Sequence, residues 1–132
     1  MTRKKASAEL AVFLGGALAV AVALLLGGAS LHAQNPDQVK QLLKTGKCRG
    51  CDLQNVQLVN VKLTGADLTG ANLSGAFLYR TILHGAMMKG ALLTGANLGG
   101  TDLSGALDVD LTNAITNEHT TCPNGKPGPC GR

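Results

Sequence analysis

A repeat of five residues constrains the fold of this chain more than any other feature. Residues 51–105 divide without a gap into eleven blocks: CDLQN, VQLVN, VKLTG, ADLTG, ANLSG, AFLYR, TILHG, AMMKG, ALLTG, ANLGG and TDLSG. The third place is Leu in ten blocks and Met88 in the other, and the first place is always Cys, Val, Ala or Thr. Gly occupies the fifth place in eight blocks. This regularity predicts that every block has nearly the same conformation.

A period of five fits neither an α-helix nor a continuous strand. Five residues advance about 500° around an α-helix, so successive leucines would spiral around its surface. Along a continuous strand, an odd period places successive leucines on opposite faces. The leucines share one core only if the chain turns within every block, and Gly at the fifth place supplies the freedom that a tight turn needs. We therefore expect a coil of short extended segments with the first and third places pointing inward.

This pattern closely resembles that of the pentapeptide-repeat family, and residues 66–75, ADLTGANLSG, nearly match the family consensus. The resemblance implies an all-β solenoid, a right-handed quadrilateral β-helix in which four blocks close one turn. A further block at 46–50 keeps the register, so residues 46–105 are expected to make about three turns. The interior columns expected from this geometry are Cys48, Leu68, Met88; Leu53, Leu73, Leu93; Leu58, Leu78, Leu98; and Leu63, Leu83, Leu103.

Both ends of a solenoid expose unpaired backbone and need covers. At the N-terminal end, residues 34–45 are predicted to form a short capping helix. Asn35 and Pro36 are typical of a helix start, and Gly46 is typical of a helix end.

The repeat loses its register after residue 105. Asp108 falls where Leu is due, and an insertion of three residues restores the pattern with Leu111 inward. Residues 106–119 are therefore expected to form a partial C-terminal turn. The tail, residues 120–132, contains three prolines and is expected to be a loop.

Residues 1–33 are predicted to be a secretory signal peptide. Positions 3–5 are basic, a long apolar run follows, and small residues precede the expected cleavage point. An uncleaved anchor is the alternative, because residues 10–31 are about long enough to cross a bilayer. Export implies the periplasm or, as the resemblance suggests for a cyanobacterial source, the thylakoid lumen, with no membrane attachment after cleavage.

The charge of the exported part argues against nucleic-acid partners. Without residues 1–33 the chain has nine basic and seven acidic residues, scattered along the sequence. This net charge is too small to indicate nucleic-acid binding. It also does not give the acidic surface that a DNA-mimic inhibitor needs, so that function is the least favoured.

All four cysteines lie in the exported part, where an even number indicates disulfides. Three pairings are possible, and the spacing favours Cys48 with Cys51 and Cys122 with Cys130. The C-x-x-C spacing of the first pair also suggests a thiol–disulfide redox protein, and buried free thiols are a third possibility. A zinc site at His119 and Cys122 lacks a second pair of ligands nearby.

The sequence gives little support for catalysis. Asp or Asn recurs at the second place of the blocks, where it points outward and supports the turn, and His84 has no obvious base or nucleophile beside it. No phosphate-binding loop, nucleophile elbow or metal-binding motif is present. We therefore expect a protein that is not an enzyme and binds no cofactor or metal.

Five outward places carry apolar residues where the consensus has polar ones: Phe77, Tyr79, Ile82, Met87 and Leu92. Phe77, Tyr79, Arg80 and Ile82 are expected to form one patch. They fall on two neighbouring walls, and an apolar surface with Tyr and Arg is typical of protein-binding sites. The favoured function is therefore an exported non-catalytic scaffold that is structural or binds a protein. A second copy of the chain is the simplest alternative partner, and the redox protein is the alternative function.

Overall fold

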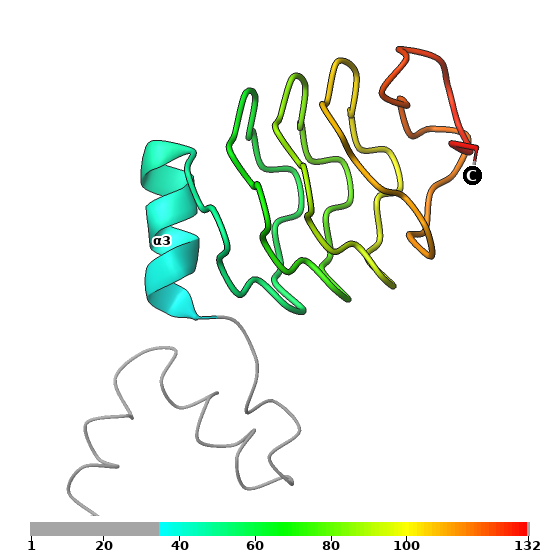
Figure 1. Ribbon diagram of the computed structural model, residues 1–132. Coiled ribbons are helices and arrows are strands. Elements are labelled where there is room, and N and C mark those ends of the chain that lie inside the picture. Colours follow the sequence, from blue (N-terminus) through cyan, green and yellow to red (C-terminus); the bar gives the residue numbers. More distant parts are fainter. Residues whose placement is uncertain (1–34, 132) are drawn as a thin grey trace, which may run out of the picture. The chain divides into compact units, whose positions relative to one another are not determined.

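The computed structural model describes residues 35–131, which form one helix, α3 (Pro36–Thr45), followed by a coil (Figure 1). The predicted signal peptide, residues 1–33, lies outside the described residues. Within residues 35–131, no helix combines the length and the apolar character needed to cross a membrane.

Helix α3 has a defined residue at each end. The side-chain oxygen of Asn35 accepts the N–H of Asp37 (3.1 Å), and Pro36 occupies the first turn, where its missing N–H has no cost. Gly46 ends the helix with a φ of 71°, and its N–H donates to the carbonyl of Leu42 (2.8 Å). Leu42 is fully buried in the core cluster, so α3 covers the first turn of the coil as predicted.

The coil repeats every twenty residues. Parallel β-bridges join Asp52 to Asn72 and Asn72 to Leu92, and the same spacing recurs around the coil. Twenty residues are four blocks, so four blocks close one turn, as expected. Within residues 35–131 the bridges are isolated, because the chain turns at a corner before a longer strand can form.

The bridges fall on the second place of each block and define four walls. Wall 1 holds Lys47, Asp67, Met87 and Leu107; wall 2 holds Asp52, Asn72 and Leu92; wall 3 holds Gln57, Phe77, Asn97 and Ile115; wall 4 holds Lys62, Ile82, Asp102 and Thr121.

Each corner between walls is a four-residue turn whose third residue has a positive φ. In one example Gly70 has a φ of 70°, and the N–H of Ala71 donates to the carbonyl of Leu68 (3.0 Å). This is the geometry of a type II turn, which explains why Gly is frequent at the fifth place. Three corners of the first two turns carry other residues: Asn55, Asn60 and Arg80.

Backbone hydrogen bonds link each turn to the turns above and below it. The N–H of Asn72 donates to the carbonyl of Cys51 in the turn below, and the N–H of Leu73 donates to the carbonyl of Leu92 in the turn above, both at 2.8 Å. The N–H of the fifth place pairs with the turn above in the same way. The N–H of the first place closes the corner, except at Val61. Of the five N–H groups in a block, the fourth therefore has no backbone partner.

The second-place Asp or Asn accepts that fourth N–H. The N–H of Ser74 donates to Oδ1 of Asn72 (3.1 Å), and the N–H of Thr69 donates to Oδ1 of Asp67 (3.1 Å). The hydroxyl of Thr69 also donates to this carboxylate, and the two bonds lower the pKa of Asp67. These acidic and amide residues therefore support the turns, as the sequence indicated.

The predicted core is confirmed. All twelve residues of the four expected interior columns are buried, with exposed fractions of 4% or less. Small first-place residues such as Ala71 and Ala96 are fully buried between the columns. This close packing explains why the first place excludes large side chains.

Three buried threonines occupy the first place leading into wall 4. The hydroxyl of Thr101 donates to the carbonyl of Leu78 in the turn below (2.6 Å), and that of Thr120 donates to the carbonyl of Leu98 (2.8 Å). Thr81 bonds the carbonyl of Leu58 in the same way. Each hydroxyl is therefore satisfied inside the core.

The fourth turn is nearly complete but shorter than the others. The chain leaves the core at Asp108, which is exposed and has a φ of 54°. It returns at Leu111 and Ala114, which are half-buried against the core as expected. Ile115 then pairs with Asn97 after eighteen residues instead of twenty.

The coil continues into residues 120–132, which were expected to be a loop. Thr121 pairs with Asp102, and Cys122 is buried above the last leucine of its column. The chain then folds back as a hairpin in which Pro127 lies antiparallel to Thr121. The difference arises because the prolines come only after Cys122, so they shape the hairpin and leave wall 4 intact.

Replacement of Leu73 by Ala should lower the free energy of unfolding by about 2–5 kcal/mol, because the change leaves a cavity at mid-height in a fully buried column. Replacement of the exposed Thr94 by Ala, on the same wall, should lower it by less than about 0.5 kcal/mol. Urea denaturation of both variants measures the difference. Equal losses at the two positions would contradict the inward register.

Candidate functional site

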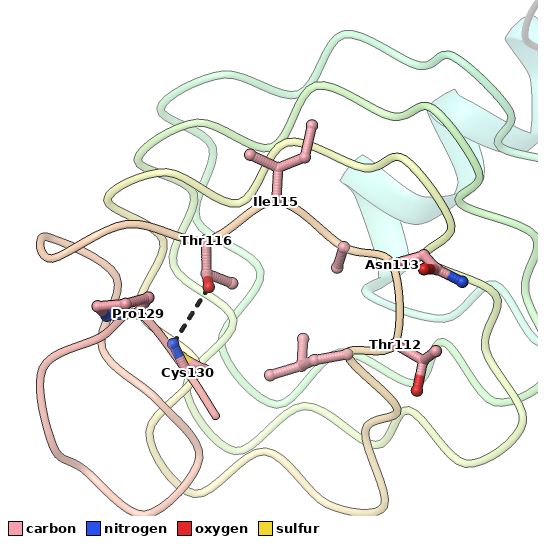
Figure 2. A pocket seen from close by; sticks show the side chains of 8 residues that line it. Thr112, Asn113, Ile115, Thr116, Pro129 and Cys130 are labelled. Carbon is pink, nitrogen blue, oxygen red and sulfur yellow. Dashed lines mark hydrogen bonds between the residues drawn. The ribbon is translucent and has the colours of Figure 1, made fainter. Parts of the chain in front are cut away.

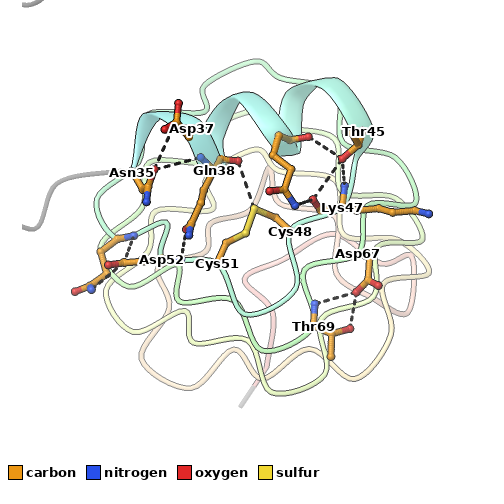
Figure 3. The surroundings of a disulfide bond; sticks show 12 residues. Asn35, Asp37, Gln38, Thr45, Lys47, Cys48, Cys51, Asp52, Asp67 and Thr69 are labelled. Carbon is orange, nitrogen blue, oxygen red and sulfur yellow. Dashed lines mark hydrogen bonds between the residues drawn. A yellow bond between two sulfur atoms is a disulfide. The ribbon is translucent and has the colours of Figure 1, made fainter.

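The first candidate site is the disulfide between Cys48 and Cys51, which lies beneath α3 (Figure 3). Cys48 has no exposed surface and Cys51 is 5% exposed. The sulfur of Cys48 lies 3.4 Å from the carbonyl oxygen of Gln38, so the helix covers it. A redox substrate must reach a sulfur atom to exchange with it. In this position the disulfide fastens the first corner of the coil.

Side chains of α3 also bond the open edge of the first turn (Figure 3). Oε1 of Gln38 accepts the N–H of Asp52 (2.7 Å), and Nε2 of Gln41 donates to the carbonyl of Lys47 (2.9 Å). The hydroxyl of Thr45 accepts the N–H of Lys47 (3.1 Å). In later turns these second-place N–H groups bond to the turn below. The helix therefore substitutes for a missing turn.

The second disulfide, between Cys122 and Cys130, ties the hairpin back to the end of the coil. The N–H of Cys130 donates to the hydroxyl of Thr116 (3.1 Å), as Figure 2 shows. Beside this bond is an open hollow of about 430 Å³, whose lining includes Leu111, Ala114 and Pro129. A second hollow of about 350 Å³ adjoins it through Leu111. The last turn is therefore only partly covered.

The four residues of the predicted binding patch lie on walls 3 and 4. Phe77, Tyr79 and Ile82 are 43%, 36% and 38% exposed, and Arg80 is exposed at the corner that joins the two walls. The guanidinium of Arg80 lies 5.3 Å from the centre of the Tyr79 ring. The structure therefore brings these four residues onto one edge of the coil.

Two further residues shape this edge, and the sequence analysis did not single them out. Val59 is 42% exposed at the same place as Tyr79 in the turn below. Gly99 occupies that place in the turn above, where a Cβ would lie 3.2 Å from Cδ1 of Tyr79 and 3.0 Å from Nδ2 of Asn117. A glycine at a fourth place, where the consensus does not need one, was the signal for this close contact.

A second group of exposed apolar residues lies elsewhere, on walls 1 and 2. Met87 pairs with Leu107 on wall 1, and Leu92 lies on wall 2; all three are more than 40% exposed. Leu107 was missed because it follows the last regular block.

On wall 4, His84, Ser104 and Asp102 form a hydrogen-bonded chain. Nδ1 of His84 lies 2.8 Å from Oγ of Ser104, and that hydroxyl donates to Oδ1 of Asp102 (2.6 Å). Partial burial raises the pKa of Asp102, but the hydrogen bonds from Ser104 and the nearby His84 outweigh it, and the pKa is lowered overall. Because the hydroxyl proton points to the carboxylate, His84 does not activate Ser104 as a nucleophile.

Within residues 35–131, His, Cys, Asp and Glu do not gather in groups of three or more that would hold a metal ion. His119 lies beside Glu118, while Cys122 is bonded to Cys130. A disulfide sulfur is not the thiolate that zinc requires.

Comparisons with known proteins agree with this geometry. A family model described as Pentapeptide repeats matches residues 47–85 and 78–107, with eight copies of the repeat. The crystal structure of a pentapeptide repeat protein from the cyanobacterium Cyanothece 51142 is 34% identical with a TM-score of 0.54, over 56% of this chain and 52% of that chain. QnrB1, a plasmid-mediated fluoroquinolone resistance protein, is 22% identical with a TM-score of 0.38, over 56% of this chain and 49% of that chain.

A pentapeptide repeat protein from Nostoc PCC 7120 is 24% identical with a TM-score of 0.25, over 75% of this chain and 89% of that chain. The chain spans about half the length of the Cyanothece protein and of QnrB1. No curated protein sequence matches the chain.

Native protein should show no reactive thiols, because both pairs of cysteines are bonded. On titration with a reductant, the bond of the half-buried Cys130 should open first, and Cys48 and Cys51 should react only when the coil unfolds. Loss of the Cys122–Cys130 bond in a double Ser variant should cost about 2.5 kcal/mol by the chain-closure relation. Mass spectrometry of alkylated protein measures each step. Rapid reduction of Cys48–Cys51 in the folded protein would instead support redox function.

Proposed function

Residues 47–107 are pentapeptide repeats, and we propose that the protein is a non-catalytic scaffold that presents a protein-binding surface on a right-handed quadrilateral β-helix. The observation that carries the proposal is the exposed edge formed by Phe77, Tyr79, Arg80 and Ile82. The consensus provides polar side chains at outward places and Gly at the fifth place. Three apolar residues and an Arg in place of Gly on one edge therefore need an explanation other than folding.

The edge has the composition of a binding site. Aromatic residues and Arg are enriched at the energetic centres of protein interfaces, because they bury a large area with few rotatable bonds. The backbone beneath them is hydrogen-bonded to the turns on both sides: the N–H of Phe77 donates to Val56 and the N–H of Leu78 to Asn97. A partner would therefore meet a surface that is already ordered.

The alternative functions receive less support from the described residues. A redox role for Cys48 and Cys51 requires access that α3 denies in the native structure. A DNA-mimic inhibitor requires a strongly acidic surface, whereas the part of the chain after residue 33 has nine basic and seven acidic residues, a net charge of +2. The hydroxyl of Ser104 is held by Asp102 and lacks an activating base.

We also propose that the protein is exported, to the periplasm or the thylakoid lumen. The basic start, the apolar run and the small residues that follow are the features of a secretory signal. Two disulfides within a chain of this size suit an oxidising compartment.

N-terminal sequencing of the protein recovered from an expressing cell tests the export proposal. The mature chain should begin near Ser30 or Gln34, because small residues favourable for cleavage precede these positions. Recovery of intact Met1 in the membrane fraction would instead favour an uncleaved anchor.

The double change Phe77→Ser and Tyr79→Ser tests the binding surface. Stability should change little, since neither residue belongs to the leucine core. Affinity for a partner isolated with the wild-type protein from the same compartment should fall by roughly 2 kcal/mol or more, about thirtyfold, if these rings are anchors. Isothermal calorimetry with the purified partner gives the value.

The matched control is Met87→Ser with Leu92→Ser, which removes two exposed apolar side chains, 41% and 53% exposed, from walls 1 and 2. This control should bind the partner as wild type does. If it weakens binding and the Phe77 and Tyr79 variant does not, the proposed surface is on the wrong walls.

A further inference from the structure

The two ends of the coil differ in how they are covered. At the N-terminal end, α3 lies over the core and buries Leu42, while Gln38 and Gln41 bond the open backbone edge. At the C-terminal end, the described residues provide only the hairpin. It covers wall 4, where its Gly128 N–H donates to Thr120 (2.7 Å). The hairpin does not cover the end of the core near walls 2 and 3, where the two open hollows lie.

The C-terminal end has an apolar floor and an acidic rim. Leu111 borders both hollows and is only half-buried, as is Ala114. Asp110 is exposed and lines the second hollow, and Asp108, two residues earlier in the chain, is also exposed. Hydrogen bonds from the side chain and backbone of Thr112 lower the pKa of Asp110, so its carboxylate is ionised at neutral pH.

The outer face of α3 has the complementary character. Lys40, Leu43 and Lys44 are exposed on it, and Leu43 is 52% exposed. Residues three and four apart share a helix face, so Lys40 lies on the same face as Leu43 and as Lys44. From residue 35 to 50 the chain has four basic residues and one acidic residue, while residues 106–132 have three acidic residues and two basic residues. The two ends of the coil therefore carry opposite charge.

We infer that the outer face of α3 in one copy docks on the C-terminal end of a second copy, so that the protein associates head to tail. Leu43 would cover the apolar floor at Leu111, and Lys40 and Lys44 would lie against Asp108 and Asp110. This contact does for the C-terminal end what α3 does within the chain for the N-terminal end: it places a helix across an incompletely covered core.

The contact uses a different surface on each copy, so it does not close on itself as a two-fold dimer does. Each added copy leaves one free end of each kind, and assembly should grow with concentration. A standard interface buries roughly 800 Å² per partner, whereas this contact would use one face of the ten-residue helix α3. We therefore expect weak association that depends strongly on ionic strength.

Analytical ultracentrifugation of the protein purified from cells expressing the full chain tests this inference. Wild type should associate progressively at low salt, and the apparent association constant should fall about tenfold or more in 0.5 M NaCl. Two variants each change the charge of one end. Lys40→Glu with Lys44→Glu reverses the charge of the helix face, and Asp108→Asn with Asp110→Lys removes the negative charge of the C-terminal end. Asn is used at position 108 because it tolerates the positive φ there.

Each variant alone should remain monomeric under conditions where wild type associates, with unchanged circular dichroism. An equimolar mixture of the two should associate again, because the unchanged helix of the Asp108 and Asp110 variant can dock on the unchanged C-terminal end of the Lys40 and Lys44 variant, and the two altered surfaces also have opposite charge. A folding defect does not predict this rescue. A wild type that stays monomeric at all concentrations, or variants that associate as wild type does, would overturn the inference.

The outcome is separable from that of the binding surface on walls 3 and 4. The Phe77→Ser and Tyr79→Ser variant keeps both ends and should associate as wild type does. If it alone abolishes self-association, the contact between copies is through walls 3 and 4, and the head-to-tail contact is excluded.

Discussion

Each corner of the coil turns on a fifth-place residue with a positive φ, and the rest of the structure depends on that conformation. The turn brings the third place of one block and the first place of the next to the same core. Four such corners return the chain to its starting wall, so residues twenty apart pair through their backbones. This pairing leaves one N–H of each block without a backbone partner, and a second-place Asp or Asn accepts it where present, as Asn72 does for Ser74.

The corner at Arg80 is less stable than a corner with glycine, and it lies at the proposed binding surface. A residue other than glycine at a φ of 58° carries a cost on the order of 1 kcal/mol. Its side chain also lies over the corner above, where a Cβ on Gly100 would be 3.2 Å from Cγ of Arg80. Departures from an otherwise consistent pattern concentrate at functional sites. Arg80 is therefore better explained by the surface that it forms with Tyr79 than by the corner that it occupies.

The regular part of the fold could be predicted from the sequence because a fixed period determines which positions of every block face the core. Once Leu73 is placed inward, every residue that is a multiple of five away is placed too, which is why all twelve core positions were found. The exposed patch could be predicted for the same reason, since Phe77 and Ile82 fall at known outward places. For the close approach of Gly99 to Tyr79, the sequence offers only a glycine at an unexpected place, because which atoms meet there depends on the distance between successive turns.

The fourth turn was harder to predict because its spacing is irregular. Ile115 pairs after eighteen residues and Thr121 after nineteen, so no single insertion restores the register. Asn117 makes up part of the difference: its Oδ1 accepts the N–H of Gly100 (3.1 Å), in place of the backbone carbonyl used in the turns below. Because a side chain accepts this hydrogen bond in place of the backbone, the five-residue pattern does not predict it.

Walls and ends of the coil offer partners different kinds of surface. On a wall, the backbone groups are already bonded to the turns above and below, so only outward side chains can distinguish one partner from another. At an end, the column of leucines stops and the core itself is exposed unless another element covers it. Leu42 of α3 supplies that cover at one end, whereas Leu111 at the other remains half-buried beside open hollows. Binding at the ends can therefore draw on the burial that stabilises the fold.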